Sequence, residues 1–204
     1  MIIVGLCGGS GSGKGAVCSV FESLGYPAID TDELYHGLTS SDSECLRELV
    51  SRFGERIIKN GALDRRALAD IVFSEDKTGE SLRDLNRIAH KHVLDETRRI
   101  ILDYSNGGRK MVVVDAPVLF ESGFDRECDL TLAVLAERDI RIKRVMSRDN
   151  ITYREAERRI DAQHTDAWLR ENATKVVENN SDTKALRLAV TDLITDILNE
   201  FGEN

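Results

Sequence analysis

The sequence predicts an α/β fold in which helices flank a parallel sheet. The first seven residues, MIIVGLC, form an apolar run rich in β-branched side chains and bounded by glycines, which is typical of a buried strand. A glycine-rich turn, a helical pattern and the short strand YPAID follow, and together they make a βαβ unit. Two further apolar runs, MVVVDAP and DLTLAVLA, alternate with helical segments, which indicates a parallel sheet covered on both faces.

The helices of the first half are predicted from their ends and their spacing. The first helix runs from about residue 13 to residue 24, and Gly25 ends it. From residue 32 to 104 the pattern is helical, with a capping box that begins at Ser41 and a further N-cap at Asp64. The long helix in this region carries inward positions at helical spacing, which are Leu82, Leu85, Ala89 and His92.

The last third of the chain continues the alternation of helices and strands. Residues 138–148 are helical, and a capping box at Thr152 and Glu155 opens a helix to about Gln163. KVVENNS is the last short strand. The closing helix carries one apolar stripe, made of Leu186, Val190, Leu193, Ile194, Ile197 and Phe201.

The composition is that of a folded chain without a general affinity for polyanions. With 204 residues, 41% hydrophobic and 31% charged, the chain can bury the core of one compact domain with insertions or of two small ones. A net charge of −8 argues against general binding to nucleic acid or to an anionic membrane. We expect a cytoplasmic protein, because neither a signal peptide nor an apolar run of about 20 residues is evident. Four cysteines without CxxC spacing predict buried thiols in a reducing compartment.

The strongest functional signal is the segment VGLCGGSGSGKGAV. From Gly8 to Lys14 it matches the P-loop pattern G-x-x-x-x-G-K-[ST], but Gly15 stands where Ser or Thr is usual. In such a loop, backbone N–H groups surround phosphate oxygens and the lysine reaches the β- and γ-phosphates. We expect the loop to bind a nucleotide through Gly9, Ser10, Gly11, Ser12, Gly13, Lys14, Gly15 and Ala16.

The same glycines allow two other interpretations. Gly11, Gly13 and Ala16 match a dinucleotide-binding turn, and Asp30 and Asp32 follow about 20 residues later, where an acid would bind the ribose. However, such a turn starts almost directly after its strand, whereas GGS intervenes here, and the turn has no role for a lysine. A flexible glycine turn without a ligand is the third interpretation.

Two acids lie at strand ends, where α/β proteins bind ligands. Asp32 follows the second strand and is placed to orient a hydroxyl group and to accept its proton during attack on phosphorus. An N-cap for the helix DELYH explains Asp32 as well, and the two roles are compatible. Asp115 ends the strand VVVD and resembles the Walker-B acid, which holds magnesium directly or through water. A turn residue at the strand end is the alternative for Asp115.

A basic segment spans residues 138–170. Arg141, Arg144 and Arg148 share one helix face, and guanidinium groups suit phosphate oxygens, so we expect this segment to contact phosphate. The alternative is a solvated surface whose arginines pair with neighbouring acids. The basic residues of the segment are Arg138, Arg141, Lys143, Arg144, Arg148, Arg154, Arg158, Arg159 and Arg170.

The histidines indicate no metal site. His90 and His92 lie two residues apart on a helix and therefore point to different faces, which is poor spacing for a metal. His164 and Trp168 are four residues apart and are expected to form a small surface contact without a chemical role.

These segments resemble those of the dephospho-CoA kinases. The motifs VGLCGGSGSGKG, IDTD, ALDRRAL followed by VF, AHKHV, DAPVLFE, RVMSRDNIT, RRIDAQ and VVENN occur in the order and spacing of that family, over nearly the whole chain. The resemblance implies a P-loop NTPase-type core like that of nucleoside monophosphate kinases, here residues 1–31, 105–137 and 171–204. It also implies a helical acceptor-binding insertion (residues 32–104) and a helical lid (residues 138–170).

The resemblance further implies an activity. The family transfers the γ-phosphate of ATP to the ribose 3′-hydroxyl of dephospho-CoA, which is the final step of coenzyme A biosynthesis. The expected cofactors are therefore ATP and Mg²⁺, and the expected substrate is dephospho-CoA. A related P-loop kinase with another nucleotide or nucleoside as acceptor, and a nucleotide-binding module without turnover, are the alternatives.

The resemblance also implies roles for single residues. Asp32 matches the proposed base, Lys14 the P-loop lysine, and Arg144 and Arg148 the phosphate-binding arginines of the lid. Asn180, or its neighbour Asn179, falls near the adenine pocket. The residues that fall in segments lining the acceptor site are Arg65, His90 and the turn PVLFE, which includes Pro117, Leu119 and Phe120.

The chain departs from the family pattern in three places. Gly15 and Ala16 replace the usual Ser-Thr, so the loop lacks the hydroxyl that normally holds magnesium, and phosphate oxygens, water and Asp115 are left to do so. Adenylate kinases also have Lys-Gly in the loop, but a threonine follows it there. Lys91 stands where the family usually has a proline after the histidine, and HTDAW replaces the usual T-x-x-x-R after the lid.

Overall fold

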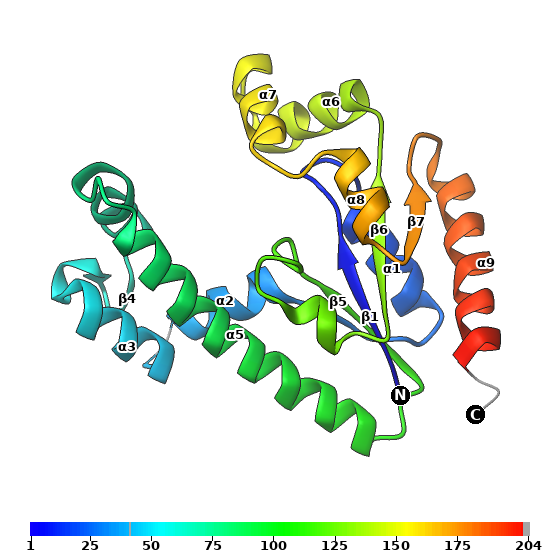
Figure 1. The fold of residues 1–204 in the computed structure, drawn as a ribbon, viewed down its shortest axis with the longest axis horizontal. Helices are drawn as coiled ribbons and strands as arrows, with labels where there is room; N and C mark the ends of the chain where they lie inside the picture. The colour runs from blue at the N-terminus through cyan, green and yellow to red at the C-terminus, as the bar shows by residue number, and fades with distance from the viewer. Residues whose placement is uncertain (41, 202–204) are drawn as a thin grey trace. The chain divides into compact units, whose positions relative to one another are not determined.

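The computed structural model describes residues 1–40 and 42–201, and the chain forms two compact units (Figure 1). Unit 1 contains Met1–Ile29 and Tyr104–Asn204, and unit 2 contains Asp30–Asp103. The sheet and the glycine-rich loop belong to unit 1, whereas unit 2 is mainly helical.

Unit 1 is built on a five-stranded sheet with the strand order β2-β5-β1-β6-β7. The central strand β1 is parallel to β5 and β6, and β7 is parallel to β6. This arrangement confirms the predicted parallel sheet, and the first four residues of β5 are buried, as the continuous apolar run MVVV indicates. The strands are β1 (Ile2–Cys7), β2 (Ala28–Asp30), β5 (Met111–Asp115), β6 (Leu130–Leu135) and β7 (Lys175–Glu178).

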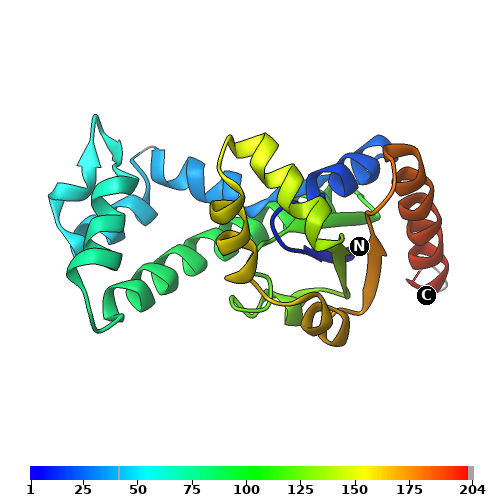
Figure 2. The ribbon, with the colours of Figure 1, turned by 90° about the horizontal axis from the view of Figure 1, so that it is seen from above.

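Helices and turns cover both faces of this sheet. On one face, α1 (Lys14–Ser23) and α9 (Thr183–Phe201) lie side by side (Figures 1 and 2) and form the main core with the sheet. On the other face, Leu119 and Cys128 contact Gly5 of β1, next to the 3₁₀-helix η3 (Phe124–Glu127). The short helix α8 (Asp166–Asn172) contacts β6.

Two further helices of unit 1, α6 (Arg138–Asp149) and α7 (Tyr153–Asp161), pack against each other. They bury a small apolar cluster that includes Val145 and Ala156. The predicted capping box at the start of α7 is confirmed, because the Thr152 hydroxyl accepts from Glu155 N and the Glu155 carboxylate accepts from Thr152 N.

Unit 2 has its own apolar core, which includes Leu49, Phe53, Leu68 and Ile88. Its helices are α2 (Thr31–Ser40), α3 (Glu44–Phe53), the 3₁₀-helix η1 (Glu55–Ile57), α4 (Arg65–Ala69), the π-helix η2 (Asp70–Glu75) and α5 (Glu80–Asn106), whose last residues belong to unit 1.

Two predicted helix starts in unit 2 have different outcomes. The Asp64 carboxylate accepts from Arg66 N and Ala67 N, so the predicted N-cap of α4 is confirmed. The capping box predicted from Ser41 lies partly outside the described residues. The N-cap of α3 is Ser43, whose hydroxyl accepts from Leu46 N.

The prediction that residues 32–104 are helical throughout is wrong at one place. The strands β3 (Ile58–Lys59) and β4 (Ala62–Leu63) pair antiparallel and form a hairpin. Asn60 and Gly61 connect them and have φ values of 54° and 79°. An Asn-Gly pair favours a tight hairpin turn because both residues tolerate positive φ, so this dipeptide was the available signal.

A polar contact joins α3 to α5 within unit 2. His92 is buried, and its Nε2 lies 2.7 Å from Glu48 Oε2, while Lys91 Nζ donates to the same oxygen at 3.1 Å. These hydrogen bonds from His92 and Lys91 lower the pKa of the Glu48 carboxyl. His92 is therefore buried and has a structural partner in Glu48.

We expect Glu48→Gln to destabilise the protein by about 1 kcal/mol at neutral pH, which corresponds to a fall of roughly 2–4 °C in melting temperature. Because the folded state lowers the pKa of Glu48, its contribution exists above the ordinary carboxyl pKa and is lost as the pH falls below about 4. Thermal melts of both proteins should therefore differ at pH 7 and converge in acid. A constant difference across this range would show that ionisation of Glu48 is not the cause.

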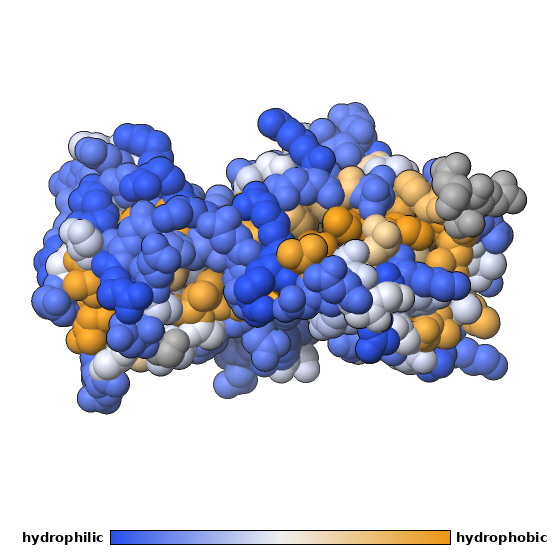
Figure 3. Space-filling model, turned by 90° about the horizontal axis from the view of Figure 1, so that it is seen from below, coloured by the Kyte–Doolittle hydropathy of each residue, from blue (hydrophilic) through white to orange (hydrophobic). Residues whose placement is uncertain are grey.

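The face shown in Figure 3 is largely polar, and three of the four cysteines are buried as predicted, whereas Cys128 is half-buried. Figure 3 shows one face, on which hydrophilic residues predominate and hydrophobic areas are smaller. All four cysteines are thiols; Cys7, Cys18 and Cys45 are buried, and burial raises the pKa of Cys7 to about 12. Within the described part of the chain, we find no helix with the length and apolar character that a membrane span requires.

Candidate nucleotide-binding site

The glycine-rich loop connects the end of β1 at Cys7 to the start of α1 at Lys14. Gly13 is the N-cap residue of α1 and has left-handed backbone geometry, with φ 101°. A Cβ atom at Gly13 would lie 2.1 Å from Asn179 Nδ2, so both its backbone angle and its close neighbour require glycine. The loop is therefore shaped by backbone geometry and by tight packing around it.

The loop contains backbone N–H groups without an acceptor in the described part of the chain and carbonyl groups that accept hydrogen bonds from side chains. Among the described residues, no acceptor bonds to the N–H groups of Gly11, Gly13, Lys14 and Gly15. These groups precede or begin helix α1, whose N-terminus adds positive potential. The arrangement is that of an anion site. The carbonyls of Ser10, Gly11 and Ser12 accept hydrogen bonds from the side chains of Arg141, Arg144 and Asn179.

Lys14 lies between the loop and the end of β5. Its Nζ donates to the Gly8 carbonyl at 3.2 Å and is 3.7 Å from Asp115 Oδ1. Asp115 ends β5 and is paired in register with Leu6 of β1, next to the start of the loop. Both side chains are only about 15% exposed, so their charges interact through a region with little solvent. The predicted lysine and the predicted Walker-B acid are thus neighbours.

The two predicted arginines of the basic segment have different surroundings. Arg144 Nη1 donates to the carbonyls of Gly11 and Ser12, so Arg144 contacts the loop. Arg148 is exposed and bonds to Asp149, which also pairs with Arg159. In this structure Arg148 therefore fits the alternative of a solvated surface with paired charges, and its predicted role at the nucleotide stays a prediction.

Asn179 and Asn180 also have different contacts. Asn179 is buried, and its Nδ2 donates to Ser12 O at 2.8 Å. Asn180 Oδ1 accepts from Glu137 N at 2.7 Å and its Nδ2 donates to Glu178, so Asn180 ties the end of β7 to the start of α6. Of the two, Asn179 is the residue that touches the loop.

Arg141, the third arginine of the predicted helix face, also contacts the loop. Its side chain is 6% exposed, and its Nε donates to Ser10 O at 3.0 Å. Its Nη1 pairs with Asp166 at 3.1 Å, and its Nη2 donates to Gln163 Oε1 at 3.2 Å. Burial lowers the pKa of this guanidinium and Asp166 opposes that effect, but an arginine remains charged in proteins. Its position on the helix face shared with Arg144 was the signal in the sequence.

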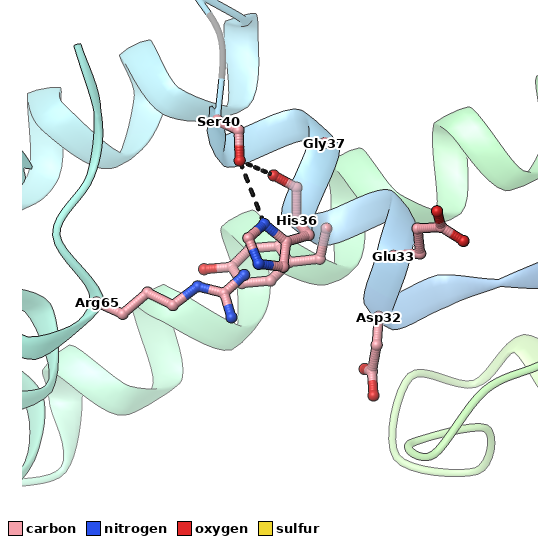
Figure 4. A pocket seen from close by; sticks show the side chains of 7 residues that line it. Asp32, Glu33, His36, Gly37, Ser40 and Arg65 are labelled. Carbon is pink, nitrogen blue, oxygen red and sulfur yellow. Dashed lines mark hydrogen bonds between the residues drawn. The ribbon is translucent and has the colours of Figure 1, made fainter. Parts of the chain in front are cut away.

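In unit 2, Asp32 and Arg65 line one pocket of about 710 Å³, together with Tyr35 and His36 (Figure 4). The Arg65 guanidinium lies 6.0 Å from the centre of the Tyr35 ring. Figure 4 shows Arg65 reaching toward His36 of α2, while Asp32 lies at the other end of the group. Asp32 and Glu33 supply carboxylates and Arg65 a guanidinium, so the pocket suits a polar ligand that has both a hydroxyl group and an anionic group.

Asp30, and not Asp32, caps helix α2. The Asp30 carboxylate accepts from Asp32 N at 2.9 Å and from Glu33 N at 3.0 Å. The N-cap interpretation of Asp32 is therefore wrong, because Asp32 already lies within the first turn of the helix. The predicted acceptor residue His90 is half-buried on α5 and is not among the residues that line this pocket.

The turn after β5 contributes to a second pocket, in unit 1, of about 390 Å³. Gly8 and Gly9 of the loop, Pro117 and Phe120 of the turn, and Gln163 line it. The predicted residue Leu119 is instead fully buried beneath the turn.

The expected contact between His164 and Trp168 is confirmed beside this pocket. Their rings stack at 3.7 Å, and Phe120 meets Trp168 edge-on at 5.0 Å. His164 Nε2 also lies 3.0 Å from Glu121 Oε1. The segment around His164 and Trp168 and the turn after β5 are thus joined by aromatic and polar contacts, of which the sequence predicted only the one between His164 and Trp168.

The parallel sheet, the glycine-rich loop between β1 and α1, and the Lys14–Asp115 pair define a P-loop protein that binds a nucleotide. The family model for dephospho-CoA kinases (CoaE) matches residues 2–185. The chain belongs to the dephospho-CoA kinase family.

Individual relatives agree with this family over nearly the whole chain. A dephospho-CoA kinase of Moorella thermoacetica is 36% identical over 192 residues, which cover 93% of this chain and 89% of the relative. One from Corynebacterium glutamicum is 33% identical and covers 97% of this chain and 100% of the relative. A crystal structure from Thermus thermophilus has a TM-score of 0.78 at 33% identity, and covers 96% of this chain and 97% of the other.

Proposed function

We propose that this protein transfers the γ-phosphate of ATP to the 3′-hydroxyl of dephospho-CoA. The observation that carries the proposal is the phosphate loop, with Lys14 and N–H groups that have no acceptor in the described part of the chain, in a chain that belongs to the dephospho-CoA kinase family. A cytoplasmic location is part of the proposal, and the four thiols suit a reducing compartment.

Each part of the reaction has candidate residues. The loop N–H groups and Lys14 bind the β- and γ-phosphates and hold the γ-phosphate for attack. Asp32 orients the acceptor hydroxyl and accepts its proton, while Arg65, in the same pocket, attracts the negatively charged acceptor. Pro117 and Phe120 line the pocket beside Gly8, and the family resemblance assigns this turn to acceptor binding.

The residues around Lys14 fit a magnesium ion that is held mainly by the nucleotide. Magnesium in phosphoryl-transfer sites keeps several waters and binds through one or two carboxylates plus phosphate oxygens. Asp115 supplies one carboxylate beside Lys14, and the described residues contain no cluster of three or more metal-binding side chains. When bound, the ion neutralises charge on the phosphates. Asp115 would hold it, directly or through water.

We expect Gly15→Ser to lower the magnesium concentration needed for half-maximal activity by a few-fold, with acceptor preference unchanged. The substitution restores the usual ligand hydroxyl at the start of α1. A Cβ atom at Gly15 meets no protein atom within 4 Å, so the protein has room for the side chain. Serine also costs less than glycine within a helix. Activity titrated against magnesium at saturating ATP measures the effect.

Gly15→Ala is the matched control, because it adds the Cβ atom without the oxygen. If alanine and serine act alike, the change reflects helix stability and not metal binding. If the serine variant has an unchanged or weaker magnesium response, the loop has adapted to Gly15 and metal support lies elsewhere, with Asp115 the first residue to test.

The proposed reaction is tested by incubating the protein with MgATP and separate acceptors, and by following product mass. Dephospho-CoA should gain one phosphoryl group, whereas AMP, adenosine and other nucleosides should not. Phosphorylation of another acceptor in preference to dephospho-CoA would indicate a related kinase. Nucleotide binding without any phosphorylated product would indicate a binding module without turnover.

A further inference from the structure

Gln163 places a side-chain oxygen directly on the phosphate loop. Its Oε1 accepts from Ser10 N at 2.8 Å and from Arg141 Nη2 at 3.2 Å, and its Nε2 donates to Ser10 Oγ at 3.3 Å. A loop N–H group and a guanidinium N–H group therefore converge on one oxygen. Phosphate oxygens in proteins commonly accept from this combination of donors.

The absence of a side chain at Gly9 makes this arrangement possible. A Cβ atom there would lie 2.0 Å from Arg141 Nη2 and 3.0 Å from Gln163 Oε1. Arg141 is fixed from its other side by Asp166 and by the Ser10 carbonyl, so its Nη2 stays directed at the loop. The guanidinium is thus a buried, positioned cation whose donor Nη2 faces the position of Gln163 Oε1.

The position corresponds to the terminal-phosphate end of the loop. A P-loop lysine reaches the β- and γ-phosphates, and Lys14 Nζ lies 3.2 Å from the Gly8 carbonyl. Gly8, Gly9 and Gln163 line the same pocket. Because the β-phosphate of a P-loop ligand lies over the N–H groups that lead into the helix, we place the γ-phosphate toward Gly8, at the pocket that Gly9 and Gln163 also line.

We propose that an oxygen of the nucleotide's terminal phosphate replaces Gln163 Oε1 as the acceptor of the hydrogen bonds from Ser10 N and Arg141 Nη2. Arg141 is then a ligand of the transferring phosphoryl group, and Gln163 competes with that group. This inference rests on the proposed function, because it takes a nucleoside triphosphate as the ligand of the loop. Arg141 is then the residue that makes the protein bind a nucleoside triphosphate more tightly than a diphosphate.

The experiment compares binding of a non-hydrolysable ATP analogue and of ADP by calorimetry, on the full chain. Arg141→Met should raise the dissociation constant of the analogue by roughly 10- to 100-fold and change that of ADP by no more than a few-fold. The reason is that a charge-assisted hydrogen bond is lost only from the third phosphate. Arg141→Lys should recover part of the loss. Gln163→Ala should strengthen the analogue by about three- to tenfold, because the competing acceptor is removed.

The controls separate this inference from folding and from the proposed function. Arg126→Met, at an exposed arginine of η3, should leave both ligands unchanged, and thermal melts report the folding of each variant. The exchange is overturned if Arg141→Met weakens the binding of ADP and of the analogue equally, or changes neither. It is also overturned if Gln163→Ala binds the analogue more weakly. A wild-type protein that binds neither nucleotide would instead refute the proposed function.

Discussion

Lys14→Ala is expected to abolish productive ATP binding, with the dissociation constant for ATP rising by about 100-fold or more. Lys14 is the only positive side chain within the loop itself, and its Nζ donates to the Gly8 carbonyl at 3.2 Å. The loss has a second component, because Lys14 also offsets the Asp115 carboxylate 3.7 Å away. Without the lysine, that largely buried carboxylate repels the incoming phosphates.

Calorimetry with ATP measures this loss, and Lys110→Ala is the matched control at an exposed lysine of unit 1. The double variant Lys14→Ala with Asp115→Asn, measured without magnesium, should bind ATP more tightly than Lys14→Ala alone if repulsion contributes. If the single variant binds ATP with unaltered affinity, the assignment of the loop as a phosphate-binding site is wrong.

Asp32→Asn is expected to lower turnover by about 100-fold or more while leaving ATP affinity nearly unchanged, because general-base steps contribute that much. The substitution keeps the shape of the side chain and leaves every donor of the loop in place. Since Asp30 caps α2, the helix keeps its N-terminal hydrogen bonds in the variant. A large loss of activity in a normally folded protein therefore reports chemistry and not helix stability.

Turnover at saturating MgATP and acceptor, together with ATP calorimetry, tests this expectation. Glu33→Gln is a close comparison, because Glu33 is the next residue and Figure 4 shows its carboxylate directed away from Asp32. We expect at most a small effect of Glu33→Gln. Turnover of Asp32→Asn within a few-fold of the wild type would remove Asp32 from the mechanism.

Features fixed by local geometry could be predicted from the sequence. The loop between β1 and α1 and the caps at Asp64 and Thr152 depend on residues close together in the chain, and each lies where the sequence indicates. The hairpin at Asn60 is also local, but its strands are only two residues long and were hidden by the helical pattern on both sides. The cap of α2 was misassigned by two residues, because Asp30 and Asp32 both satisfy the same local rule.

By itself, the sequence determined the P-loop, the alternation of helices with the strands of a parallel sheet, and the family to which the chain belongs. Only the tertiary structure decided which polar side chains reach the loop. Arg144 and Arg148 share a helix face, but one turn advances about 5.4 Å, so Arg144 meets the loop carbonyls and Arg148 pairs with Asp149. Asn179 and Asn180 are adjacent at the end of β7, yet only Asn179 is directed into the loop, because a change of one position along an extended chain reverses the side chain's direction. Such choices depend on how distant segments pack, which spacing along the chain does not specify.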